Sequence, residues 1–166
     1  KGPSLAQLVQ QVKHGARPPL SHVELLSIFR QLAEAVAALH EHKLSILHRD
    51  LKPANVLLAP PLRPMLIGLG LGLARAGTGE AASRYGRGPG TTAYMAPEQA
   101  ASSPLDERAD IFALGLIMHE LVTGDCLGGK GPVPPWMGRR AWAPPPLSAI
   151  DRTFPRALEN AILSCL

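Results

Sequence analysis

The sequence predicts an α+β fold that is mainly α-helical. Two long segments repeat apolar residues at steps of three and four, which is the spacing of a helix with a buried face. Two short apolar runs, ANVLL at 54–58 and PMLIGL at 64–69, are separated by prolines and predict a pair of strands around a loop. Hydrophobic residues make up 46% of the 166 residues and aromatic residues only 4%, so we expect one core built mainly from Leu, Ala, Val and Ile.

The N-terminal part of the chain predicts two helices. SLAQLVQQV at 4–12 has helical spacing, and the sequence HGARPP then interrupts it. Ser21 precedes Glu24 by three residues, as in a capping box, and predicts the start of a second helix that runs to about Lys43. This second helix is apolar over so much of its surface that we expect it to be buried on most sides.

The C-terminal part predicts two more helices between irregular segments. LDERADIFALGLIMHELVTG indicates a large buried helix over about 106–123, with Gly124 placed to end it. PRALENAILSCL opens a final helix. We expect the polar, Gly-rich residues 76–93 to form a flexible surface loop, and the Pro-rich segment 125–155 to have little regular structure.

Composition and charge exclude several classes of protein. The formal net charge of +4 is not gathered into a basic stripe, so we expect no nucleic-acid partner. No apolar run approaches the roughly 18 residues of a membrane span, and the N-terminus lacks the layout of a signal peptide. Cys126 and Cys165 have no metal-ligand spacing and favour a reduced, cytoplasmic protein. We expect His40, His42 and His119 to be satisfied or surface histidines rather than metal ligands.

Both ends of the sequence look cut. There is no initiator Met, and the chain stops inside an apolar helical pattern, so we expect a piece of a longer protein.

The residues that carry chemistry lie in HRDLKPANVLL at 48–58. Asp50 is suited to accept a proton from a hydroxyl nucleophile. Lys52 is suited to neutralise charge on a transferring phosphoryl group, and Asn55 offers Mg²⁺ a neutral oxygen ligand. A base, a phosphate clamp and a metal ligand are the parts that phosphoryl transfer needs.

The same stretch is similar to the catalytic loop of protein kinases, H-R-D-L-x-x-x-N, complete in residue type and spacing. The lysine two residues after Asp50 resembles the serine/threonine branch of that family. GTTAYMAPE at 90–98 resembles the end of the activation segment, and DIFALG at 110–115 resembles the start of its large buried helix. YMAPEQ and the Ala- and Pro-rich composition resemble bacterial kinases of the eukaryotic type. The resemblance covers essentially the whole chain and implies a protein-kinase-like C-terminal lobe, with a catalytic loop at 48–55 and an activation segment over about 68–98.

The resemblance implies a catalytic role for four residues. Asp50 matches the catalytic base, Lys52 matches the lysine on the γ-phosphate of ATP, and Asn55 matches the second-metal ligand. Thr91 matches the threonine that bridges to the catalytic Asp and Lys.

Four further residues match positions that support the loop. His48 and Arg49 belong to the loop motif, and Arg49 matches the arginine that pairs with a phosphorylated activation loop. Glu98 matches the structural Glu of A-P-E, and Asp110 matches the aspartate that braces the loop from below.

Two parts of the family's ATP site are missing from the sequence. The chain begins after the Gly-rich loop, the strand lysine and the helix Glu, so it lacks the N-terminal lobe. The D-F-G motif is not intact, because its aspartate falls at Gly68 by counting from Asp50 and at Gly70 by counting back from Leu73. A glycine side chain cannot bind Mg²⁺, which leaves Asn55 as the one recognisable metal ligand. The binding of ATP and Mg²⁺ that the family implies is therefore expected to be weakened or lost.

Three hypotheses for the function follow. In the first, the parent protein is an active kinase that transfers the γ-phosphate of ATP to Ser or Thr hydroxyls of protein substrates, while this chain alone is inactive. In the second, it is a pseudokinase that acts as a binding or regulatory scaffold. In the third, GLGLGLAR is the phosphate loop of another nucleotide-binding protein, but it fits neither G-x-G-x-x-G nor G-x-x-x-x-G-K-[ST]. Four hydroxyls are candidate phosphorylation sites: Thr78, Ser83, Tyr85 and Thr92.

Overall fold

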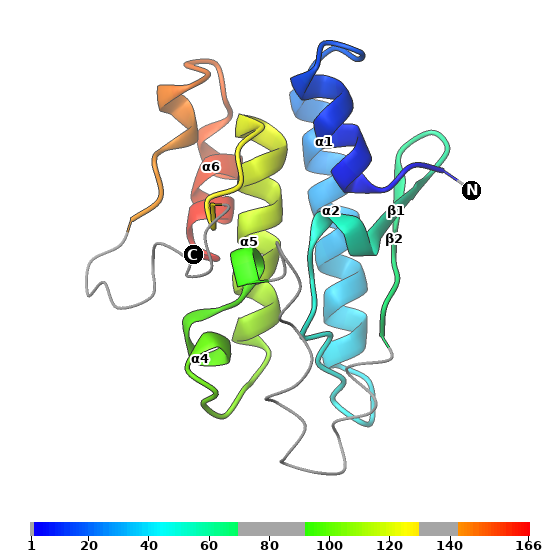
Figure 1. Cartoon of the computed structure of the whole chain (residues 1–166), viewed down its shortest axis with the longest axis vertical. Helices are drawn as coiled ribbons and strands as arrows, with labels where there is room; N and C mark the ends of the chain where they lie inside the picture. The colour runs from blue at the N-terminus through cyan, green and yellow to red at the C-terminus, as the bar shows by residue number, and fades with distance from the viewer. Residues whose placement is uncertain (1, 70–91, 130–142) are drawn as a thin grey trace.

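The computed structural model of the protein describes residues 2–69, 92–129 and 143–166. Two long helices lie side by side in the middle of the molecule, and a two-stranded sheet lies at one flank (Figure 1). The elements are α1 (Leu5–Lys13), α2 (His22–His40), the 3₁₀ turn η1 (Pro53–Asn55), β1 (Val56–Ala59), β2 (Arg63–Leu66), η3 (Thr92–Tyr94), α4 (Pro97–Ala100), α5 (Arg108–Thr123), η4 (Leu147–Ala149) and α6 (Arg156–Leu163). The predicted α+β, mainly α-helical class is confirmed.

Both N-terminal helices begin at capping boxes. The Ser21 side chain accepts a hydrogen bond from the Glu24 N–H, and the Glu24 carboxylate accepts one from the Ser21 N–H at 2.8 Å, as the sequence predicts. Ser4 and Gln7 form the same reciprocal pair at the start of α1. Each helix therefore starts where a side chain satisfies N–H groups that have no partner inside the helix.

The predicted end of the second helix at about Lys43 is wrong. α2 ends at His40, and the Ile46 N–H then donates to the carbonyl of Leu39 at 3.0 Å. The chain thus folds back over the last turn of the helix. The helix therefore ends in a turn formed by the residues that directly follow it.

The prediction that this helix is buried on most sides is also wrong. Its buried residues lie on one face: Leu25, Ile28, Leu32 and Val36. On the outer face, Val23 is 78% exposed and Leu26 is 54% exposed. α2 is therefore a surface helix with one core-facing stripe.

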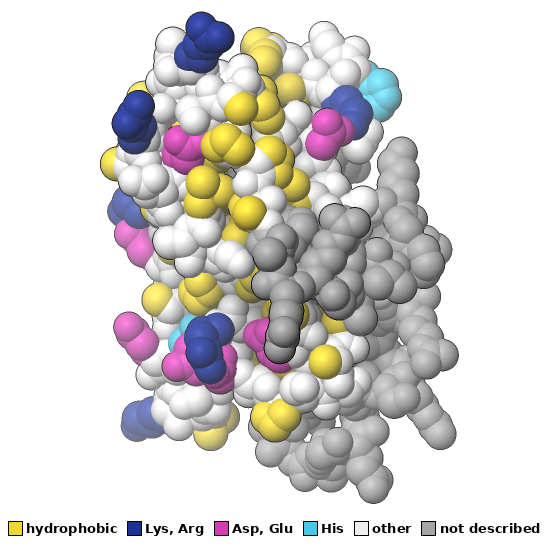
Figure 2. Space-filling view, turned by 90° about the vertical axis from the view of Figure 1, so that its left-hand side faces the viewer, with side chains coloured by type: hydrophobic (Ala, Val, Ile, Leu, Met, Phe, Trp, Pro, Cys, Tyr) yellow, Lys and Arg dark blue, Asp and Glu magenta, His cyan; other side chains and the backbone are white. Residues whose placement is uncertain are grey.

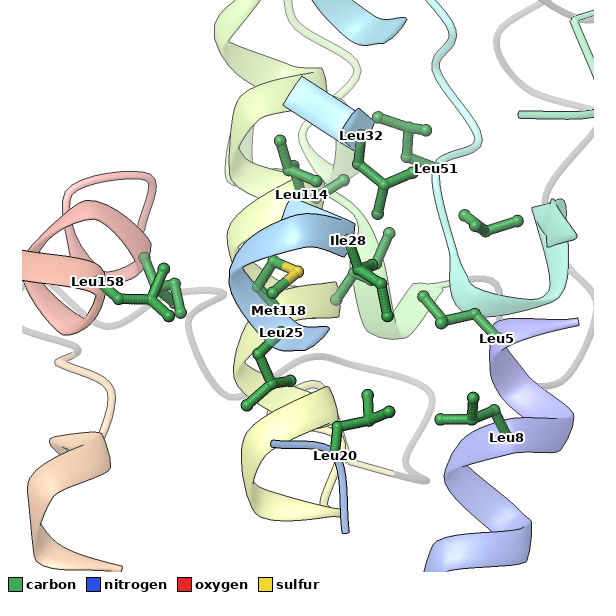
Figure 3. Close-up of a cluster of buried hydrophobic side chains, with 14 of the residues drawn as sticks. Leu5, Leu8, Leu20, Leu25, Ile28, Leu32, Leu51, Leu114, Met118 and Leu158 are labelled. Carbon is green, nitrogen blue, oxygen red and sulfur yellow. The ribbon is translucent and has the colours of Figure 1, made fainter. Parts of the chain in front are cut away.

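The large buried helix is confirmed as α5. Every residue from Phe112 to Glu120 is buried, and Gly124 ends the helix in the left-handed conformation at φ +74°. The helix begins at Arg108, two residues later than predicted. Figure 3 shows side chains of α1, α2 and α6 packed around it in the main core cluster. α5 is thus the central support of the molecule.

The strand pair is an antiparallel hairpin, β1 with β2, in which Val56 pairs with Leu66. The strands are shorter than the predicted runs. Beyond the last pair, the Ile67 N–H still donates to the Asn55 carbonyl at 3.0 Å. The hairpin therefore brings the residue that precedes β1 beside the residues that follow β2.

The irregular segments contribute more to the core than the sequence indicates. Of the predicted loop 76–93, residues 76–91 lie outside the described part of the chain. Ala93 belongs to η3 and is only 3% exposed, so the expectation of an exposed loop is wrong there. In the Pro-rich segment, Leu147 and Phe154 are buried in the main core cluster. These apolar residues anchor the described part of the segment, 143–155, to the core.

Hydrophobic side chains also gather on the face seen in Figure 2. An apolar groove of about 390 Å³ lies between α2 and α6, lined by residues that include Val23, Leu26 and Leu158. No helix in the described ranges has both the length and the apolar character needed to cross a bilayer.

The packing of α2 against the segment before α6 should depend on pH through Asp151. Hydrogen bonds from the Thr153 side chain and then from His22 lower the pKa of Asp151 from 3.8 to about 2. A carboxyl group whose pKa is lower in the folded state stabilises the fold above its unfolded pKa, and this contribution is lost as the pH falls. Asp151→Asn should be less stable than the wild type at pH 7, with the difference shrinking between about pH 4 and pH 2.

This difference can be measured as the free energy of unfolding by urea across that pH range. Glu34→Gln is the matched control, because Glu34 forms a solvent-exposed pair with Arg30 within α2. A deficit of Asp151→Asn that stays constant from pH 7 to pH 2 would contradict this interpretation.

Candidate functional site

The predicted loop 48–55 lies between α2 and β1 and has an unusual backbone. Arg49 is in the left-handed region at φ +65°, which costs a non-glycine residue roughly 1–2 kcal/mol. Leu51 is buried in the main core cluster and anchors the middle of the loop. A strained residue beside an anchored one is typical of loops that place a functional side chain.

The structure brings Asp50, Lys52 and Asn55 together. The Lys52 Nζ lies 3.0 Å from Asp50 Oδ1 and 2.9 Å from Asp50 Oδ2. The Asn55 Nδ2 donates to Asp50 Oδ2 at 2.9 Å and to the Asp50 carbonyl at 2.8 Å. The Asp50 and Lys52 side chains are 16% and 22% exposed, so the group is partly screened from water but still accessible. Asn55 is held in place by η1 and by the hairpin. Its side chain therefore restrains the Asp50 carboxylate, which Lys52 also contacts.

Asp110, at the start of α5, contacts the backbone of the loop through its carboxylate. Its side chain is almost fully buried, and it accepts hydrogen bonds from the N–H groups of His48 and Arg49, both at 2.8 Å. His40 Nε2 lies 2.9 Å from Asp110 Oδ2 and supplies a third contact. His40 is thus a satisfied histidine, as expected, but the sequence did not reveal its partner 70 residues away.

His48 connects the loop to the end of the hairpin. It is fully buried, and its Nε2 lies 3.0 Å from the Ile67 carbonyl. Its Nδ1 lies 3.4 Å from the Asp50 amide nitrogen. This pattern assigns the proton to Nε2, because a carbonyl oxygen can only accept. The ring therefore couples the backbone of Asp50 to the residues just before Gly68.

Gly68 lies directly beside Asn55. A Cβ built on Gly68 would be 3.2 Å from Asn55 Nδ2 and 3.6 Å from Asn55 Oδ1, and the residue has φ +89°. Gly70, the other candidate for the altered D-F-G position, lies outside the described residues. The geometry thus places one of the two glycines next to the predicted metal ligand.

The remaining predicted residues are not part of this cluster. Thr91, and with it Thr78, Ser83 and Tyr85, lies outside the described ranges; Thr92 is half-buried in η3. Glu98, in α4, lines a hollow of about 420 Å³ together with Arg108 and Leu166. Within the described part of the chain, no hydrogen bond or ion pair to the Glu98 carboxylate is found.

Sequence reasoning missed two polar contacts near the site. The Gln99 side chain donates to the carbonyl of Arg49. The Tyr94 hydroxyl donates to the Glu120 carboxylate, and burial raises the pKa of Glu120 above 4.5. One signal was present, since Glu120 is an acidic residue inside the apolar pattern of α5, but its partner comes from 26 residues away.

Comparisons with known proteins agree with this geometry. The protein kinase domain family matches residues 1–131. Serine/threonine-protein kinase Pkn1 of Myxococcus xanthus is 34% identical over 152 residues, 89% of this chain and 22% of that protein. Serine/threonine-protein kinase PknB of Mycolicibacterium smegmatis is 30% identical over 120 residues, 72% of this chain and 18% of that protein. The chain thus spans about a fifth of the length of these two relatives.

A solved structure extends the likeness to three dimensions. The kinase domain of Mycobacterium tuberculosis PknI superposes with a TM-score of 0.67 at 26% identity, over 100% of this chain and 54% of that domain. The similarity therefore reaches across the helices, the hairpin and the loop between them. Because the family match covers most of the sequence and the relatives are bacterial serine/threonine kinases, the chain belongs to the protein kinase domain family, in its bacterial, eukaryotic-like serine/threonine branch.

Proposed function

We propose that this chain is the part of a kinase domain that carries the catalytic loop, in a protein that transfers the γ-phosphate of ATP to Ser or Thr hydroxyls of protein substrates. The observation that carries the proposal is the joint placement of Asp50, Lys52 and Asn55 within hydrogen-bond distance of one another. The expected partners are ATP and a protein with a Ser or Thr acceptor, and the expected location is the cytoplasm. The chain alone, which spans about half of a solved kinase domain, is expected to be inactive.

Each of the three side chains has a task in this proposal. Asp50 accepts the proton of the acceptor hydroxyl through a carboxylate oxygen. Asn55 Nδ2 holds the Asp50 carboxylate in one orientation. The Oδ1 atom of Asn55 is then left for a cation. Lys52, now paired with Asp50, moves its ammonium group to a transferring phosphoryl group and offsets the charge there.

The residues present fit the phosphate of ATP better than they fit Mg²⁺. Mg²⁺ binds oxygen ligands, commonly one or two carboxylates with several waters, and it neutralises phosphate charge when bound. Asn55 supplies one amide oxygen, while Gly68 beside it supplies no side chain. Among the described residues, no group of three or more His, Cys, Asp or Glu side chains is placed to hold a metal ion. Binding of Mg²⁺ through this half of the site is therefore expected to be weak.

This deficiency supports a second candidate function. A protein that keeps the fold and the Asp50 cluster but has no carboxylate at position 68 is suited to a binding or regulatory role without phosphoryl transfer. Gly68 is the observation that favours this pseudokinase hypothesis.

Gly68→Asp in the full-length gene product tests the two functions against each other. The new carboxylate would lie beside Asn55 and supply the missing ligand. We expect Mg²⁺-ATP to raise the unfolding midpoint more in the variant than in the wild type, and the rate of phosphate transfer to a generic protein substrate to rise on the order of 10²-fold. The φ of +89° should make the unliganded variant less stable by roughly 1–2 kcal/mol.

Gly68→Asn is the matched control, because it has the same shape and the same backbone strain but no charge. It should be destabilised to a similar extent and gain no activity. If Mg²⁺-ATP stabilises neither the wild type nor Gly68→Asp, the binding role is favoured. If the wild type transfers phosphate as fast as Gly68→Asp, then Gly68 is not the altered metal position.

A further inference from the structure

The peptide group between Arg49 and Asp50 is held at both of its edges. Its carbonyl oxygen, on Arg49, accepts a hydrogen bond of 2.5 Å from Gln99 Nε2. Its nitrogen, on Asp50, lies 3.4 Å from His48 Nδ1. The orientation of this peptide plane sets the direction in which the Asp50 side chain leaves the backbone. Gln99 reaches this plane from outside the loop, from α4.

The backbone at this point needs such support. Arg49 has a φ of +65°, which a non-glycine residue adopts only when its surroundings hold it there. Asp110 holds the N–H of Arg49, and Gln99 holds its carbonyl. The two ends of the strained residue are thus fixed by two different helices, α5 and α4.

There is little room for a water molecule to replace the glutamine. A space of only about 10 Å³ borders Arg49, Asp50 and Gln99, which is at the lower limit for one water. A side chain of the same length without an N–H donor would remove this hydrogen bond to the Arg49 carbonyl.

We propose that Gln99 is a positioning residue for Asp50: its carboxamide fixes the strained Arg49–Asp50 peptide and thereby couples α4, which closes the activation segment, to the orientation of the catalytic carboxylate. The catalytic part of this inference rests on the proposed function, while the clamp itself does not. A shift of α4 would withdraw the donor and release the peptide plane. Gln99 thus links the position of α4 to the orientation of Asp50.

The test compares Gln99→Met, which keeps the length of the side chain but has no donor, with Gln99→Lys, which restores an N–H donor of similar reach. Gln31→Met is the matched control, because Gln31 also donates to a main-chain carbonyl, that of Ser27 within α2. In this chain, NMR would follow the carbonyl ¹³C shift of Arg49 and the exchange rate of the Asp50 amide. In the full-length gene product, kcat and KM for ATP would be measured with a generic protein substrate.

We expect Gln99→Met to shift the Arg49 carbonyl resonance and to speed exchange of the Asp50 amide at least tenfold. It should lower kcat by about 10- to 100-fold with KM for ATP within about twofold, since small misplacements of a reacting group have effects of this size. Gln99→Lys should recover both readouts in part, and Gln31→Met should change neither.

Two results would overturn the inference. One is an Arg49 carbonyl shift in Gln99→Met equal to that of the wild type, which would show that there is no clamp. The other is a changed carbonyl shift with an unchanged kcat, which would show a clamp that does not position Asp50. A wild type without phosphate transfer, combined with a clamp seen by NMR, would instead contradict the proposed function and the catalytic part of the inference, and leave the clamp established.

Discussion

Asp110→Asn is expected to lower the free energy of unfolding by about 3–5 kcal/mol, the cost of removing one partner from a buried charged network. The Asp110 carboxylate is 1% exposed and accepts three hydrogen bonds, from the N–H groups of His48 and Arg49 and from His40. An asparagine has one oxygen, and its NH₂ group would face at least one of these donors. A buried donor without an acceptor loses its hydration without replacement. The loop should loosen together with the start of α5.

Urea unfolding followed by circular dichroism gives this free energy directly. Asp106→Asn is the control, because Asp106 lies shortly before Asp110 in the chain and its half-exposed side chain pairs with Arg108. Its effect should be far smaller, since exposed ion pairs contribute little. Equal destabilisation by the two variants would show that Asp110 is not the brace of the loop.

Asp50→Asn is expected to reduce phosphate transfer by the full-length gene product about 10²- to 10⁴-fold, the usual contribution of a general base. Asparagine has the same size but no basic oxygen at neutral pH. The side chain can still accept a hydrogen bond from Asn55, so the loop should keep its shape. The loss should therefore appear in kcat, while the unfolding midpoint changes little.

The measurement is the initial rate of phosphate incorporation into a generic protein substrate at saturating Mg²⁺-ATP. Asp106→Asn again serves as the control, because it removes the same charge from a residue that pairs with Arg108 and not with the Asp50 cluster. Transfer by Asp50→Asn at the rate of the wild type would rule out Asp50 as the base. A fall in the midpoint as large as that of Asp110→Asn would indicate a structural role instead.

Much of the fold could be predicted because its signals are local. The capping box at Ser21 and the left-handed stop at Gly124 depend on residues a few positions apart, and both are confirmed. The hairpin was predicted from two short apolar runs around prolines. The predicted cluster of Asp50, Lys52 and Asn55 is equally local, since a 3₁₀ turn folds residues 53–55 back toward Asp50.

The errors arise where residues outside the predicted element decide. The sequence of α2 has no local stop before Lys43, and the helix ends earlier because Ile46 folds back onto it. Its apolar outer face predicted burial on most sides, but the partners within the described chain cover only one face. The periodicity of apolar residues shows which residues share a face of a helix. It does not show how many other elements pack against that helix.

The same division holds for the site. The amino-acid sequence by itself determined the helices, the hairpin and the three polar side chains of the loop, because helical and strand spacing, caps and short turns depend on neighbouring residues. Only the tertiary structure decided which residues from other elements hold the loop in place. Asp110 reaches the loop from 61 residues away, Gln99 from 50, and His40 meets Asp110 across 70. Such pairs form because a buried polar group must find a partner once water is excluded, and the packing of α2, α4 and α5 determines which partner is within reach.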